Sequence, residues 1–130
     1  MARSDVKAVT ITADTVALDA DGISVAAAVG NNAALVIGGA LASGGSVTLS
    51  HGRVVTILSA GDDSAKSFTV TGTDVDGDSQ TESITGANAG TATGAAYFLT
   101  ISGISAVGNP AGNVSAGVNG SAADVIFAGR

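Results

Sequence analysis

Short runs rich in Val, Ile, Thr and Phe recur along the chain at roughly ten-residue intervals, separated by clusters of Gly, Asn, Asp and Ser. Within most runs apolar and polar residues alternate, a period typical of strands with one buried face. No stretch has the period of an amphipathic helix. The pattern predicts antiparallel strands at 6–12, 33–37, 46–50, 53–59, 67–73, 79–85, 96–107 in one or two pieces, 113–118 and 124–127.

This spacing of short strands predicts an all-β protein, a compact antiparallel β-sandwich that is jelly-roll-like or Ig-like. At 130 residues the chain is long enough for one core. We expect residues 1–22 to form an extended N-terminal arm and a first strand, and residues 23–130 to form the single sandwich domain. Glycine-rich loops are expected at 38–45 (GGALASGG) and 85–94 (TGANAGTATG).

Four short segments have the composition of turns. "DADG" at 19–22 and "DVDG" at 74–77 share one turn chemistry, although the sequences after them diverge. "SHGR" at 50–53 predicts a tight turn between two strands, and "VGNPAGN" around Pro110 predicts another.

The alternating runs 67–73 and 79–85 flank "DVDG" and predict a hairpin. Its register depends on loop length, because a slip of one residue sends every side chain to the opposite face. A two-residue loop, Asp76 and Gly77, would place Ile84 on the polar face. A loop of residues 75–77 with a left-handed glycine keeps the apolar residues together, so we predict the longer loop.

The predicted register gives the hairpin two chemically different faces. Phe68 lies opposite Ile84 and Val70 lies opposite Glu82 on the apolar face. The other face is a ladder of hydroxyl groups suited to water or to a polar partner, with Thr69, Thr71 and Thr73 facing Ser83, Thr81 and Ser79.

Glu82 shares a face with Phe68 and Ile84, and two environments for it remain open. A buried carboxylate would need a cation, with Lys66 and Arg53 available, or several hydrogen-bond donors. An edge position would instead leave the charge in solvent, where it discourages edge-to-edge aggregation.

Composition limits the class of partner. The chain is 45% hydrophobic, but it has one Tyr, three Phe and no Trp, so its core is built from small side chains and self-association would add stability. With 11 acidic against five basic residues, the net charge of -6 argues against nucleic acid. The bases are scattered, at Arg3, Lys7, Arg53, Lys66 and Arg130. The absence of cysteine excludes disulfides and zinc-thiolate sites.

The longest apolar stretch, Ile23 to Ala42, is a poor membrane span. Asn31 and Asn32 interrupt it, and most of its apolar residues are small. We expect buried strand joined by a turn at "GNN", and no membrane partner. No secretory signal is expected, because no continuous apolar region follows Arg3 and Lys7.

The acidic stretch "TDVDGDSQTE" raises the possibility of calcium binding. A helical-hand calcium loop needs oxygen ligands at positions one, three, five and twelve and glycine at six. Counted from Asp74, position six is Ser79 and position twelve is Thr85, so the motif fails. A looser cation site made of Asp74, Asp76 and Asp78 remains as an alternative to a plain turn. We expect no cofactor.

No catalytic set is apparent. His51 is the only histidine, and no serine lies in a G-x-S-x-G context, although Ser50 or Ser59 could be combined with Asp62 or Asp63. Phosphate-binding loops, dinucleotide fingerprints and His-Glu metal motifs are absent from the sequence. We therefore expect a protein that is not an enzyme.

One long block resembles a known family. Residues 53–118 contain a hairpin "FTVTGTD.DG..QTE.ITG", a connector "NAGTATG", a strand "YF.T...I" and a closing strand "AGNVS.G". In this order the segments resemble small proteins of tailed bacteriophages that are encoded among the virion structural genes.

The resemblance implies a capsid decoration (cement) protein that binds the outer surface of the phage head and braces neighbouring major capsid subunits. Its partners would be the major capsid protein and itself, as a homotrimer or alternatively a dimer. It would be assembled in the host cytoplasm and located on the virion surface. The expected contact residues are in the arm and in the loop at 38–45, namely Ala2, Arg3, Val6, Lys7, Leu41 and Ala42.

Two other functions remain open. "VTGTDVDGDSQT" at 70–81 is also similar to the calcium-supported domains of bacterial adhesins, which suggests a tail-associated or adhesin-like module that binds a host surface. A threonine-rich face could instead bind sugar or ice, but such arrays need repetition across several strands. In the sequence only Thr69, Thr71 and Thr73 offer it.

Overall fold

The computed structural model describes residues 19–119, which form an all-β, antiparallel structure. The strands at 6–12 and 124–127, and most of the expected N-terminal arm, lie outside these residues. Seven strands occur within the described range: β1 (Asp19–Ala28), β2 (Ala42–Ser43), β3 (Ser46–Ser59), β4 (Ser67–Thr73), β5 (Ser79–Thr85), β6 (Thr91–Val107) and β7 (Asn113–Val118).

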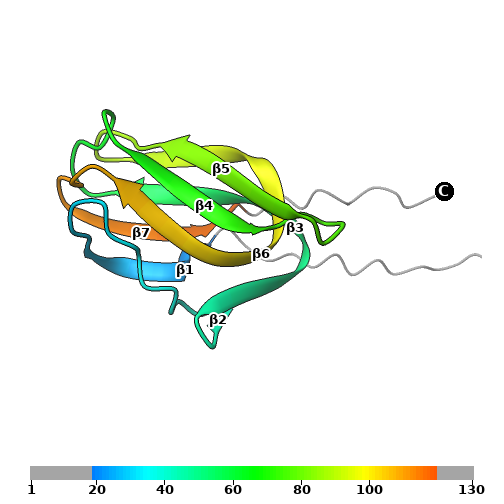
Figure 1. Ribbon diagram of the computed structural model, residues 1–130. Coiled ribbons are helices and arrows are strands. Elements are labelled where there is room, and N and C mark those ends of the chain that lie inside the picture. Colours follow the sequence, from blue (N-terminus) through cyan, green and yellow to red (C-terminus); the bar gives the residue numbers. More distant parts are fainter. Residues whose placement is uncertain (1–18, 120–130) are drawn as a thin grey trace, which may run out of the picture.

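The strands form one sheet that folds into two layers, as expected for a sandwich. Its hydrogen-bonded order is β1-β7-β3-β6-β4-β5, and β2 pairs with β3. In Figure 1 the strands β4, β5 and β6 lie in front of β3, β7 and β1. The long strand β6 joins the layers, because its first part pairs with β3 and its last part pairs with β4.

The core lies between the layers and consists mainly of β-branched and small side chains. Each layer contributes residues that are fully or almost fully buried, including Ile23, Val55, Phe68, Phe98 and Ile104. Among residues 19–119 two of the buried residues are aromatic, Phe68 and Phe98. Burial of side chains of this size contributes about 1.5–3 kcal/mol each, so many modest contributions stabilise the fold.

The strands at 67–73, 79–85 and 113–118 are confirmed with the predicted boundaries. The turn at "GNN" is also confirmed, with Asn32 at a positive φ of 55°. The strand at 33–37 is wrong, because that segment has only an isolated bridge from Ala34 to Ser105. There the chain crosses from one layer to the other: Leu35 N–H donates to the carbonyl of Ile104 and Gly38 N–H donates to that of Ile23.

The predicted turn at "SHGR" is wrong. Residues 46–59 form the single strand β3, and His51 lies half-buried within it. The pairing with β6 does shift there, from Thr48 opposite Thr100 to Arg53 opposite Phe98. The turn-like residues at 50–52 therefore lie in a bulge with several extra residues on β3, which bends the strand without ending it.

Two further loop predictions need correction. "DADG" lies in β1, although the pairing with β7 is irregular between Asp19 and Ser24. The second half of the loop at 85–94 is the start of β6, which begins at Thr91. Strand β1 also crosses the expected boundary between residues 22 and 23. At both loops tertiary pairing overrides the unfavourable strand preference of Gly and Asp or Gly alone.

The hairpin register is confirmed. Phe68 lies opposite Ile84, Val70 opposite Glu82, and Thr71 opposite Thr81. Gly77 has a φ of +87°, the left-handed conformation that the three-residue loop requires. Residues 19–119 contain no helix that is long and apolar enough to cross a membrane.

Candidate functional surfaces

The front layer carries a regular array of hydroxyl groups on its outer side, here called the hydroxyl face. It is three strands wide and has four cross-strand rows. From β5 through β4 to β6, the rows are Thr85-Ser67-Val107, Ser83-Thr69-Ser105, Thr81-Thr71-Gly103 and Ser79-Thr73-Thr100. Every position except Gly103 and Val107 therefore carries a hydroxyl group.

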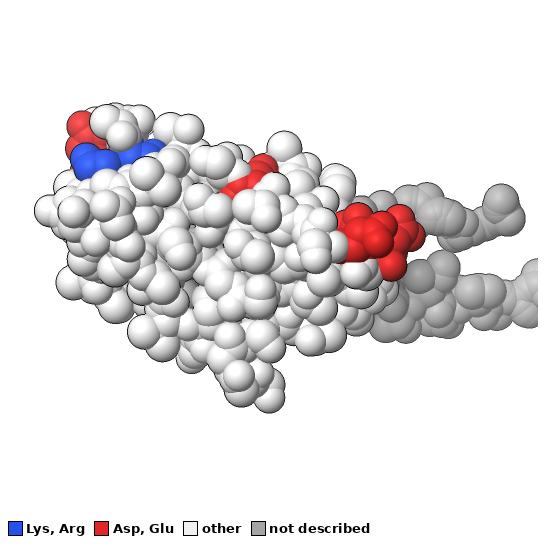
Figure 2. Space-filling model, in the orientation of Figure 1, with Lys and Arg blue, Asp and Glu red and all other residues white. Residues whose placement is uncertain are grey.

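No charged residue belongs to these rows, and most of this side of the molecule is uncharged in Figure 2. The six positions Thr71, Ser79, Thr81, Ser83, Thr85 and Ser105 are exposed. Adjacent strands are about 4.8 Å apart and alternate residues along a strand about 6.7 Å apart, so the hydroxyl groups have regular spacing. The hydroxyl face can donate and accept hydrogen bonds at fixed positions.

Hydrogen bonds hold the end of the hydroxyl face together. The hydroxyl groups of Thr73 and Thr100 are 2.7 Å apart. Ser102, at a one-residue bulge in β6, donates to the carbonyl of Thr71 over 3.2 Å. The sequence predicted the hydroxyl ladder of the β4-β5 hairpin, whereas the pairing of β6 with β4 is not visible in the pattern. The structure extends the array to β6.

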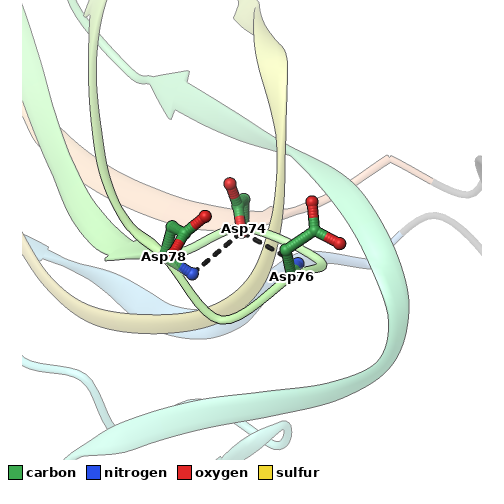
Figure 3. Close-up of side chains that lie close together, drawn as sticks. All are labelled: Asp74, Asp76 and Asp78. Carbon is green, nitrogen blue, oxygen red and sulfur yellow. Dashed lines mark hydrogen bonds between the residues drawn. The ribbon is translucent and has the colours of Figure 1, made fainter.

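The tip of the β4-β5 hairpin carries the acidic residues Asp74, Asp76 and Asp78. Figure 3 shows their side chains around the turn, and Figure 2 shows acidic atoms gathered at this end. Asp74 Oδ1 accepts hydrogen bonds from the backbone N–H of Asp76, at 2.8 Å, and of Asp78, at 3.0 Å. Asp74 N–H donates to the carbonyl of Asp78 over 2.9 Å.

One oxygen from each of the three carboxylates lies within 4.8 Å of the others. Asp76 and Asp78 are exposed and Asp74 is half-exposed. Since Asp74 Oδ1 already receives two N–H groups, the observed arrangement accounts for the turn without an ion. The predicted turn is formed. Its three carboxylates are also close enough to share a cation, as the alternative cation site requires.

Glu82 connects the two layers at the open side of the sandwich. Its carboxylate accepts hydrogen bonds from the N–H groups of Ala95, at 2.5 Å, and Ala96, at 3.2 Å. These amides lie where β6 departs from its pairing with β3, between Thr93 and Tyr97. Glu82 is half-buried rather than buried, and it has the several donors that the first predicted environment requires, which are backbone amides.

Gln80 extends this link by donating from Nε2 to the carbonyl of Tyr97 over 2.8 Å. Gln80 and Glu82 alternate with the outward hydroxyl groups of β5, so they project toward the other layer. Together these two side chains form what we call the polar seam, which joins β5 to β6 by side-chain hydrogen bonds.

Asp62 and Asp63 organise the loops at the other end of the sandwich. Asp63 is fully buried, and its Oδ1 accepts from Ala111 N–H at 2.7 Å. Its Oδ2 is buried without a hydrogen-bond partner among the described residues. Hydrogen bonds from the hydroxyl and the N–H of Ser64 lower the pKa of the exposed Asp62, with a smaller contribution from Lys66.

The expected partner-binding residues fall into two groups. Ala2, Arg3, Val6 and Lys7 lie outside the described residues. Leu41 and Ala42 are partly buried and pack against the core. In their loop Gly38, Ala40 and the segment Ser43 to Gly45 are exposed. Gly44 and Gly45 have positive φ values and close the β2-β3 hairpin.

No protein-family model, curated protein or solved structure matches this chain.

Proposed function

We propose that this chain is a structural virion protein, a capsid decoration protein that binds the outer surface of a phage head and stabilises contacts between major capsid subunits. The observation that carries the proposal is the hydroxyl face. It is regular and uncharged, and it is built by the strands of the block that resembles phage structural proteins.

The chemistry of the hydroxyl face suits a broad protein surface. Hydroxyl groups on a hydrogen-bonded sheet lose little conformational freedom on binding, because the strands already fix their positions. A face without charge can contact a protein lattice without desolvating ions. Twelve positions at the spacing of a sheet cover on the order of 400 Å², which is small for a stable complex. Many copies acting on one lattice would compensate for weak individual contacts.

The partners in this proposal are the major capsid protein and further copies of the chain, with a homotrimer as the first arrangement and a dimer as the alternative. The protein would be added to the head in the host cytoplasm and would remain on the virion surface. No catalytic step is part of the proposal.

The proposal is tested by cosedimentation of the purified protein with phage heads from which it has been stripped. Thr71→Lys and Thr81→Lys place a charge at the centre of the hydroxyl face, where the two residues are paired. Thr93→Lys is the matched control, since Thr93 is an exposed β6 residue outside the hydroxyl face.

We expect the unmodified protein and the control to sediment with heads, and the two face variants to remain in solution. Circular dichroism establishes that each variant is folded. A protein that stays in solution at all salt concentrations would rule out decoration. Equal binding by all variants would show that another surface contacts the head.

The acidic tip supports a second candidate, a tail-associated or adhesin-like module that binds a host surface with calcium support. Its basis is the proximity of the three carboxylates. Binding to host cells that is lost on chelation of calcium would favour this function over decoration.

A further inference from the structure

The outer edge of β1 from Val25 to Ala28, here called the β1 edge, is unusual for a protein surface. β1 lies at the end of the sheet and pairs only with β7 among the described strands. All four residues of the β1 edge are apolar and exposed, and Val25 is 51% exposed. Sheet edges are normally protected by charge, proline or a covering segment. The β1 edge has neither charge nor proline.

The preceding part of the same edge is covered by the chain itself. The carbonyl of Gly22 accepts from Leu41 N–H at 2.8 Å, and that of Ile23 accepts from Gly38 and Gly39 at 3.1 and 2.9 Å. Residues 38–41 therefore lie along β1 between the β1 edge and Asp19, where the described chain begins. A strand that followed β1 back from Asp19 would have to displace residues 38–41. A strand from another molecule meets no such obstacle.

From these observations we infer that the β1 edge pairs with the same edge of a second copy of this chain, in antiparallel orientation. Two identical edges satisfy each other's unpaired N–H and C=O groups about a two-fold axis. Small side chains allow close approach, and association would bury apolar groups that the single molecule leaves in water. This inference does not depend on the proposed function, and of the two arrangements given there it selects the dimer over the homotrimer.

Charge explains why the orientation is antiparallel. Each copy has a net charge of -6, and Asp19 and Asp21 lie at the start of β1. A parallel pair would bring these carboxylates together. In an antiparallel pair centred on the β1 edge, the two Asp21 residues are about 11 positions apart, which is roughly 36 Å along the strand direction. At that distance physiological salt screens their repulsion.

The test is sedimentation equilibrium of the full chain over a range of concentrations. Val25→Lys and Ala27→Lys each place a charge within the apolar edge that association would bury, and a lysine at a sheet edge opposes edge-to-edge pairing. Val107→Lys is a matched control, because Val107 is 50% exposed and lies on β6, away from β1. Circular dichroism shows that the variants retain the fold.

We expect a dimer of the unmodified chain and of the control, and a dissociation constant raised by about tenfold or more in both edge variants. Amide hydrogen exchange at Val25 to Ala28 should slow as the protein concentration rises. A monomer at about 1 mM, an assembly of three, or a dimer unaffected by the edge variants would overturn the inference. So would slow exchange of these amides in a monomer, since part of the same chain would then cover the edge.

Discussion

At the scale of single residues, Gly72 and Gly103 show how one sheet can hold two glycines for different reasons. A Cβ at Gly72 would collide with the backbone of Thr100 and Ile101, whereas a Cβ at Gly103 would meet nothing within 4 Å. We predict that Gly72→Ala lowers the free energy of unfolding by about 1–3 kcal/mol through overpacking. Gly103→Ala should be neutral or stabilising by up to about 1 kcal/mol. Urea denaturation of both variants measures the difference, and equal effects would contradict the close approach at Gly72.

Asp74 tests whether the acidic tip is a turn or a cation site. Asp74→Asn retains an oxygen that can accept from Asp76 and Asp78 N–H, so the melting temperature should change little. Asp74→Ala removes both hydrogen bonds and should cost about 1 kcal/mol. If the turn needs no ion, a chelator leaves all three melting curves unchanged. A melting temperature that falls on chelation, and that becomes insensitive to the chelator in Asp74→Asn, would establish a structural cation instead.

Asp62 provides a test by pH. Because Ser64 donates two hydrogen bonds to its carboxylate, the pKa of Asp62 is lowered. A carboxyl group with a lowered pKa in the folded state stabilises the fold above its unfolded pKa, and this contribution disappears as the pH falls through the folded pKa. Ser64→Ala should raise the Asp62 pKa in an NMR titration, while Ser64→Thr retains the hydroxyl group and preserves most of the shift. Ser83→Ala, on β5, is the control and should leave the Asp62 pKa unchanged.

At the scale of elements, the polar seam links β5 to the first part of β6, which do not pair through their backbones. Glu82→Ala leaves the N–H groups of Ala95 and Ala96 without their carboxylate acceptor, so we predict a loss of about 1–3 kcal/mol in the free energy of unfolding. Glu82→Gln keeps one oxygen acceptor and should lose less. Amide exchange of Ala95 and Ala96 should accelerate in Glu82→Ala. Unchanged exchange at both amides would show that the carboxylate does not hold them.

The contrast between β4-β5 and β3 shows what the sequence determines at this scale. The hairpin register follows from local alternation and one left-handed glycine, so Phe68 opposite Ile84 was predictable. The continuity of β3 depends on β6, a partner distant in sequence. β6 pairs with β3 on both sides of the bulge that contains His51 and Gly52, so the strand continues. The environment of Glu82 also depends on residues distant in sequence, because its two donors lie 13 and 14 residues away. Local patterns predict local pairings, and long-range pairings decide where turn-like residues remain in a strand.

At the scale of the whole molecule, the acidic tip lies beyond one end of the uncharged hydroxyl face, next to the row Ser79-Thr73-Thr100. Acidic residues gather at the hairpin tip, while the rows across β5, β4 and β6 carry no charge (Figure 2). The sequence predicted the hydroxyl ladder of one hairpin, but the full width of the array required the pairing of β4 with β6. This separation makes the two proposed functions distinguishable, because a contact made by the tip depends on salt and a contact made by the hydroxyl face does not.

If the hydroxyl face contacts the capsid, head binding should change little between about 0.05 M and about 0.5 M NaCl, because exposed charges carry the salt dependence of association. Replacement of Asp74, Asp76 and Asp78 together by Asn, which removes the charge of the tip, should leave the bound fraction unchanged at both salt concentrations. Thr71→Lys should reduce binding at both. Quantitative cosedimentation of these proteins with stripped heads measures each effect. A steep fall of binding with salt that disappears in the triple Asn variant would instead place the contact at the acidic tip, since only charged groups respond to screening over this range.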